Sequence, residues 1–232
     1  MTGTMPLTAR RLRTPRAAAI AGIVFAALLI AVLALFLSAV PKDPLEEGAW
    51  LSDSVRQVVV AINLVPFAGI AFLWFIGVVR DRLGEAEDRL FATVFLGSGL
   101  LFLAMLFVAA AVFGAMVAVN AARPDSLANS TTYALARAFA YSIVNVYAIK
   151  MAGVFMMVTS TLALRTGFLA RWIGILGLIL ALCLLFGSQL FDWSFAVFPA
   201  WVLLISGYIL IDNFQLAPHA GKSEAGGATP AR

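Results

Sequence analysis

Long uncharged apolar runs constrain this chain more than any other feature of its sequence. The first run, Ala17–Val40, follows the pair Thr14-Pro15, which is typical of a helix start. A helix needs about 20 apolar residues to cross roughly 30 Å of hydrocarbon. The apolar region of a cleaved signal peptide is shorter, at about 7–15 residues. We therefore expect this run to be a membrane-spanning helix.

Five further apolar runs follow, separated by short polar segments. Of the 232 residues, 62% are hydrophobic and 12% are charged, whereas a soluble domain has about 45–50% apolar and about 25% charged residues. So few charges could not cover so much apolar surface in water. The sequence predicts an all-α polytopic transmembrane helix bundle in one domain, residues 17–216, with about six spanning helices. These are expected near 17–40, 57–79, 90–119, 138–164, 172–191 and 193–211.

The basic residues lie mainly at the ends of the apolar runs. A cytoplasmic N-terminus places the basic segment 1–16 inside with most other Lys and Arg residues, and leaves Lys42, Arg56 and Arg123 outside. This asymmetry satisfies the positive-inside rule and puts both termini in the cytoplasm. It is unlike a groove that tracks phosphates, so no nucleic-acid partner is expected. The Gly/Ala-rich segment 217–232 is predicted to be a disordered cytoplasmic tail.

Lys150 is the most informative single residue. It lies near the middle of the fourth span, where a charged side chain costs at least about 2.5–3.5 kcal/mol. Such residues usually face a bundle interior, and at 100° per residue Tyr147 falls on the same face. Lys150 is therefore a candidate site for a substrate, an anion or a proton. The alternative is that its long stem snorkels outward. Arg137, nearer the outer end, is expected to be an interfacial anchor.

Asn63 and Pro66 mark a second polar feature, in the second span. Pro66 lacks an N–H, so the carbonyl of Ile62 loses its partner within the helix and a kink is expected. We expect Lys150 to point into the bundle and to contact polar atoms near Asn63 and Pro66. The candidate intramembrane polar site is then Lys150, Asn63, Pro66 and Tyr147. The alternative is a purely structural kink, with Asn63 bonded to a neighbouring helix.

Local signals predict two further features. The segment Asn129-Ser130-Thr131 is expected to cap the fourth helix. Trp50, Trp172 and Trp193 fall near predicted membrane interfaces, where amphipathic rings settle.

The usual catalytic and metal-binding combinations are missing. The chain has one Cys, Cys183, and one His, His219, which nearly excludes Ser/His triads, Cys/His pairs and His-based metal sites. No carboxylate lies in the middle of a span. No cofactor is therefore expected, and an enzyme is the least favoured class.

One loop resembles a known signature. The segment Gly77–Gly84 resembles the loop motif that major facilitator transporters carry between their second and third helices. The resemblance ends at Glu85-Ala86, where that family continues with basic residues, and that family has about twice as many spans. No functional role follows from it, and a charged turn with Gly84 as the helix cap explains the segment equally well.

The chain as a whole resembles the uncharacterised six-helix integral membrane proteins of actinobacteria. The segments that carry this resemblance are Asn63–Gly69, Trp74–Gly84 and the run from Glu87 to Gly99. The resemblance implies membrane localisation, and the Arg-rich, Lys-poor composition suggests a GC-rich bacterial genome. We therefore expect a multi-pass protein of the bacterial cytoplasmic membrane. The resemblance implies no activity.

Two main function classes follow. A non-catalytic membrane component or partner subunit fits the absence of any predicted soluble domain. A small-solute carrier or channel would instead use the intramembrane Lys150. The expected partners are the lipid bilayer and either another membrane protein or further copies of this chain.

Overall fold

Helices make up all the regular structure in the described part of the chain. The computed structural model describes residues 14–43, 46–83, 89–124, 127–167, 169–187 and 194–220, with side chains outside 14–18, 81–90 and 212–220. The elements are α1 (Thr14–Ala39), α2 (Trp50–Asp53), α3 (Val55–Leu83), α4 (Arg89–Ala122), α5 (Thr131–Ser142), the π-helix η2 (Ile143–Ala148), α6 (Ile149–Thr166), α7 (Arg171–Gly187) and α8 (Ser194–Ala220). The predicted all-α class is confirmed.

Most of these helices can cross a bilayer. Among the described residues, five spans are long and apolar enough: Ala19–Ala39, Val55–Arg80, Phe91–Ala122, Thr131–Thr166 and Ser194–Ile211. The fourth of these joins α5, η2 and α6 into one helix. The remaining apolar helix, α7, has 17 residues, at the lower limit of the roughly 17–25 that a span requires.

Two predicted boundaries differ from the structure. The fourth span begins at Thr131 rather than near 138, because Ser130 caps the helix and its hydroxyl accepts a hydrogen bond from the Tyr133 N–H at 3.1 Å. This confirms the predicted cap. At the other end, α8 continues to Ala220 and so enters the segment predicted to be disordered from residue 217. The predicted turn at Gly84 and residues 221–232 lie outside the described residues.

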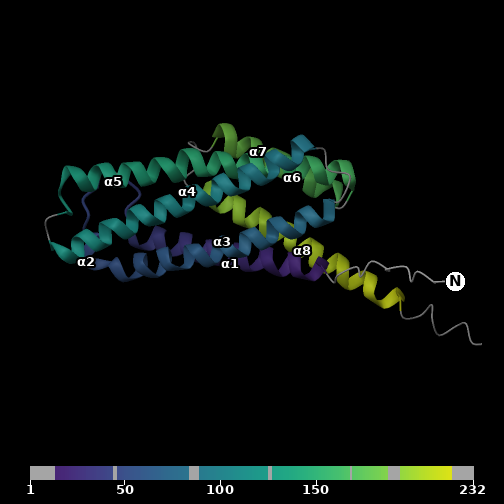
Figure 1. The fold of residues 1–232 in the computed structure, drawn as a ribbon, viewed down its shortest axis with the longest axis horizontal. Helices are drawn as coiled ribbons and strands as arrows, with labels where there is room; N and C mark the ends of the chain where they lie inside the picture. The colour runs from purple at the N-terminus through teal and green to yellow at the C-terminus, as the bar shows by residue number, and fades with distance from the viewer. Residues whose placement is uncertain are drawn as a thin grey trace, which may run out of the picture.

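The helices pack as an elongated bundle with both ends of the chain on one side. In Figure 1, α1 begins and α8 ends at the same end of the long axis, whereas α2 and α5 lie at the other end. We call these the terminal end and the distal end. The most extensive contacts join α1 with α3 and α8, and join α6 with α7 and α4.

A cluster of five phenylalanine rings holds the middle of the bundle together. Phe72 of α3 is at its centre and has no exposed surface. Its ring centroid lies 4.5 Å from Phe25 of α1, 5.6 Å from Phe102 of α4, 5.3 Å from Phe155 of α6 and 5.8 Å from Phe198 of α8. Lipid chains are as apolar as these side chains, so close packing rather than exclusion from water favours the assembled bundle.

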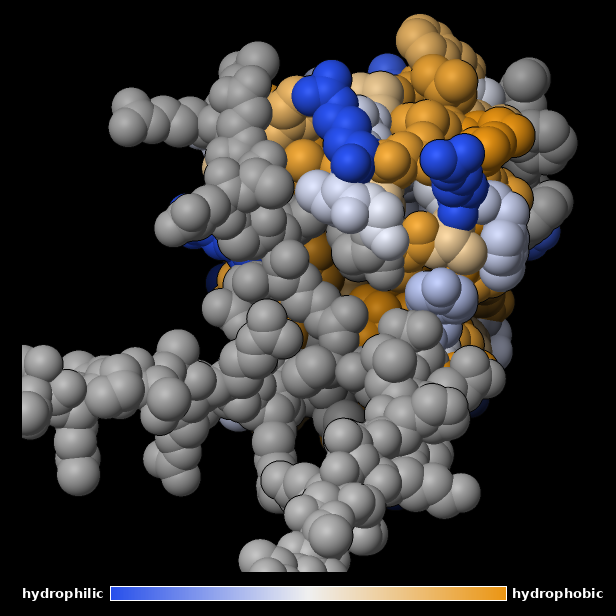
Figure 2. All heavy atoms as spheres, turned by 90° about the vertical axis from the view of Figure 1, so that its right-hand side faces the viewer, coloured by the Kyte–Doolittle hydropathy of each residue, from blue (hydrophilic) through white to orange (hydrophobic). Residues whose placement is uncertain are grey.

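The outer surface of the bundle is strongly apolar. Phe186 is 84% exposed, Leu135 72% and Trp74 68%. Figure 2 views the terminal end, where strongly hydrophilic side chains lie beside hydrophobic ones in the coloured part of the surface. The apolar outer surface is suited to contact with lipid rather than with water.

The contact of α6, α7 and α8 is tight at Gly177. A Cβ atom at this position would meet the Ser160 hydroxyl oxygen and would lie 2.6 Å from Trp201 Nε1. Both polar atoms are buried without a hydrogen-bond partner. The helices can therefore approach this closely only because residue 177 has no side chain.

We predict that Gly177→Ala destabilises the bundle by about 1–3 kcal/mol, the usual effect of an added methyl group in a filled core. Thermal unfolding of the purified protein in detergent measures the effect. Gly207→Ala is the matched control, because no atom lies within 4 Å of a Cβ there. Its unfolding temperature should be unchanged or raised, since Ala favours a helix over Gly. Equal unfolding temperatures for the two variants would contradict the packing described.

Candidate functional site

A cavity of about 230 Å³ opens in the distal half of the bundle. It lies between the end of α1 and the α5–η2 segment, and α4 forms its floor. Its walls are mainly aliphatic and aromatic, with four polar or charged side chains, and it is lined by Leu29, Val32, Leu33, Phe36, Leu37, Val40, Pro41, Lys42, Val65, Leu106, Ala109, Ala110, Phe113, Arg137, Ala140, Tyr141, Val144, Asn145 and Phe195.

The cavity exists because α8 begins part-way along α1. The two helices run antiparallel: Gly22 packs against Ser206, and Phe25 against Phe198. Phe195, in the first turn of α8, faces the cavity together with Leu29 and Leu33. From Leu33, α1 continues for about six more residues, or roughly 9 Å, to its end. Phe195 is the only described residue of α7 or α8 that lines the cavity. Neither helix therefore fills the space between α1 and η2.

The π-helix η2 forms part of the opposite wall. Val144 and Asn145, both in η2, line the cavity. The Asn145 side-chain amide donates a hydrogen bond to the Tyr141 carbonyl at 3.0 Å, so it is held against its own helix. Single turns of π-helix inside α-helices occur frequently at functional sites, because they redirect side chains locally.

Arg137 closes the distal end of the cavity. It is only 7% exposed, and its Nη2 donates a hydrogen bond to the Pro41 carbonyl at 2.7 Å. Its guanidinium carbon lies 5.6 Å from the centroid of the Phe113 ring. Arg137 therefore ties α5 to the end of α1. The prediction of an ordinary interfacial anchor is wrong, because Tyr133, Arg137 and Ala140 share the buried face of α5.

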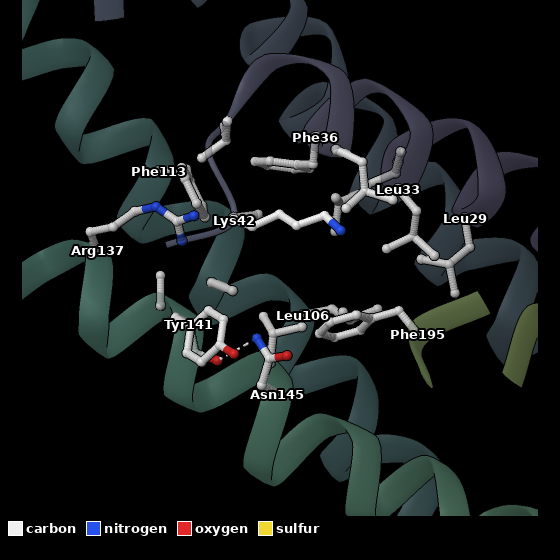
Figure 3. Close-up of a pocket in the computed structure, with 18 of the residues that line it drawn as sticks. Leu29, Leu33, Phe36, Lys42, Leu106, Phe113, Arg137, Tyr141, Asn145 and Phe195 are labelled. Carbon is white, nitrogen blue, oxygen red and sulfur yellow. Dashed lines mark hydrogen bonds between the residues drawn. The ribbon is translucent and has the colours of Figure 1, made fainter. Parts of the chain in front are cut away.

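Lys42 adds a second cation at the same end. Figure 3 shows its side chain extending along the cavity, with Phe36 on one side and Tyr141 and Asn145 on the other, while Arg137 points toward it from α5. Leu29 and Phe195 lie at the opposite end. The cavity wall is therefore mainly apolar, with Arg137 at its distal end and the Lys42 amine directed into it.

A small polar cap closes the distal end of the bundle beside the cavity. Trp50 Nε1 donates a hydrogen bond to the Tyr133 hydroxyl at 2.8 Å, and the Gly48 N–H donates one to the Ala128 carbonyl at 3.1 Å. Trp50 is only 2% exposed and its ring lies 5.8 Å from that of Phe113. Trp50 is therefore packed inside the protein at this end of the bundle, and its indole N–H has a buried partner.

The residues of the predicted intramembrane polar site do not come together. Lys150 is exposed and Tyr147 is 57% exposed. Asn63 is also exposed, and its side-chain amide donates to the Val59 carbonyl of its own helix at 2.7 Å. Pro66 is exposed inside α3, which is helical on both sides of it. The structure therefore does not bring these four residues together.

The physical reason is the orientation of α6. Its core-facing side carries Ala152, Met156 and Thr159, which are almost completely buried. Lys150 lies on the opposite side of the helix. Asn63 satisfies its amide within α3, so it has no need of a partner from another helix.

Comparison with known proteins does not assign this chain to a family. No protein-family model, no curated protein and no solved structure matches this chain. Within the described residues, no group of three or more His, Cys, Asp or Glu side chains is placed to hold a metal ion.

We predict that Arg137→Met lowers the thermal-unfolding temperature by several degrees. A hydrogen bond to a charged group contributes about 1.5–3 kcal/mol, and the Met side chain cannot donate one to Pro41. Lys150→Met is the matched control, because it removes a cation from the same continuous helix without removing a hydrogen bond among the described residues. It should change the unfolding temperature little. A larger effect at Lys150 than at Arg137 would contradict these assignments.

Proposed function

We propose that this protein is a non-catalytic multi-pass component of a bacterial cytoplasmic membrane, and that its cavity binds the acyl chain of an anionic single-chain amphiphile. One observation carries the proposal: a mainly apolar cavity of about 230 Å³ has two basic side chains in its wall, Arg137 at its distal end and Lys42 extending along it. The volume is below the about 300–1,000 Å³ of drug-sized ligand sites. It suits part of one chain rather than a bulky ring system.

The two basic side chains, rather than the apolar wall, would determine affinity. An acyl chain gains little by moving from lipid to an apolar protein wall, because the two surroundings are equally apolar. A guanidinium has five N–H donors, and the Pro41 carbonyl and the Tyr133 side chain take up only part of them. Hydrogen bonds from Arg to a phosphate group are short and roughly twice as strong as neutral ones. Discrimination among amphiphiles should therefore depend on the charge of the headgroup.

The alternative of a carrier or channel built on Lys150 gains no support from the geometry. Lys150 is exposed on the outer face of α6 and is not among the residues that line the cavity. We therefore favour the non-catalytic component.

We further propose that the terminal end faces the cytoplasm. Arg80, Arg165 and Arg171 are exposed on that side, near the ends of α3, α6 and α7. At the distal end the exposed cations Lys42, Arg56 and Arg123 are offset by four exposed carboxylates, Asp43, Glu46, Glu47 and Asp53. A basic side that also holds both ends of the described chain supports a cytoplasmic location.

Reporter fusions test this orientation. An enzyme that is active only outside the cytoplasm should give signal when fused after residue 125 and none when fused after residue 85, because α4, which lies between these positions in the sequence, is long enough to cross the bilayer. The opposite pattern would reverse the proposed topology.

Quenching of Trp50 by brominated lysolipids tests the cavity. Trp50 packs on Phe113, which lines the cavity, so bromine atoms on a bound chain should quench its fluorescence. We predict saturable quenching by dibrominated lysophosphatidylglycerol, and at least about tenfold weaker binding of lysophosphatidylcholine with the same chain. Arg137→Gln should remove the difference between the two headgroups.

Two cavity-filling variants are the controls. Ala110→Phe and Val144→Trp fill the cavity from opposite walls and should abolish saturable quenching by either lipid. Their unfolding temperatures show whether each variant is folded. Trp50→Phe should lose the signal, which assigns it to this residue. Equal binding of both lysolipids to the wild-type protein, or unchanged quenching in a folded cavity-filling variant, would overturn the proposal.

A further inference from the structure

Lys150 places a positive charge on the outward face of α6, at the depth of the bundle core. Its side chain is exposed, and it forms no hydrogen bond or ion pair with any of the described residues. Its neighbour Ile149 lines a small inner cavity together with Leu29 and Phe102. These residues belong to the middle of α1 and α4. The exposed ammonium is therefore level with the core and far from either end.

At this depth the Lys150 ammonium group cannot easily reach water. Lys150 is about 15 residues from Arg165 and about 19 from Thr131, or roughly 22 Å and 28 Å along the helix. A central position is about 15 Å from either edge of the hydrocarbon region. A four-carbon stem is too short to span that distance. A lone cation that faces lipid here is strongly unfavourable.

The surface around Lys150 is suited to helix packing. Tyr147, one turn away on the same helix, is 57% exposed. On the adjacent helix, Leu185 lies 3.1 Å from the Cβ position of Gly153, so α6 and α7 pack closely at this level. The next residue, Phe186, is 84% exposed. Large apolar side chains are thus exposed on η2 and on α7.

We infer that this face of α6 is a docking surface for a transmembrane helix of another protein, one that carries an Asp or Glu at mid-depth. Intramembrane ions are stabilised chiefly by pairing with an opposite charge or with backbone carbonyls. A carboxylate at the same depth would compensate the Lys150 ammonium. The flanking apolar side chains would pack against the partner helix.

A second copy of this chain cannot supply that carboxylate. Each Asp and Glu in the sequence lies in a loop, near the end of a span or in the tail. A two-fold dimer through this face would also bring equivalent Lys150 residues toward each other, and like charges repel strongly in a medium of low dielectric constant. The partner is therefore a different protein.

A synthetic helix tests the inference with the purified full-length protein in lipid vesicles. The probe is a labelled polyleucine transmembrane peptide with one central Asp, and the reference peptide has Leu at that position. Energy transfer from labelled protein should show that the Asp peptide associates about tenfold more tightly. Lys150→Met should abolish this preference. Lys150→Asp should reverse it, so that a peptide with a central Lys binds more tightly than the Asp peptide.

Arg171→Met is the matched control, because it removes an exposed cation at the terminal end of α7. The Asp preference should survive in this variant. Lysolipid quenching should be unchanged in Lys150→Met, which separates this inference from the proposed function of the cavity. Equal association of the Asp and Leu peptides, or a preference that persists in Lys150→Met, would overturn the docking surface.

Discussion

The short α7–α8 pair is the constraint on which the distal half of this protein depends. Near the terminal end, α1 packs against both α3 and α8, and α6 packs against both α4 and α7. Phe195 marks the start of α8 at the level of Leu33. Beyond that level α1, α3, α4 and α5 continue without described residues of α7 or α8 beside them. The phenylalanine cluster fills the space between α1, α3, α4, α6 and α8, but the shorter α7–α8 pair leaves a cavity next to α1.

Polar contacts stabilise the distal half of the bundle, where the cavity interrupts the close packing of the helices. The hydrogen bond from Arg137 to the Pro41 carbonyl and the bond from Trp50 to Tyr133 both join α5 to segments that follow α1. Such bonds are worth most where water is scarce, because an unpaired donor in an apolar setting is costly. The same guanidinium that holds the bundle together faces the cavity. Arg137 therefore has two roles in this account: it joins α5 to the segment after α1, and it is the candidate contact for a lipid headgroup.

The sequence predicted the class of fold well and the site poorly, for different physical reasons. A long apolar run such as Ala17–Val40 must form a helix in lipid, because its backbone N–H and C=O groups have no water to bond with. The helices could therefore be predicted directly from the sequence. At 100° per residue, Arg137 and Lys150 fall on different faces, as observed. Which face turns inward depends on the neighbouring helices, and sequence periodicity alone does not reveal it. The i, i+4, i+7 series Tyr133, Arg137 and Ala140 was the available signal for the buried arginine.

The central claim is that the cavity beside α1 holds one anionic lipid in the membrane. Native mass spectrometry of the protein extracted gently from its own membrane measures this most directly. We expect one retained anionic lipid per wild-type chain, absent from a folded Ala110→Phe variant and no longer selected for charge in Arg137→Gln. Identical lipid adducts in the wild-type protein and in Ala110→Phe would contradict the account.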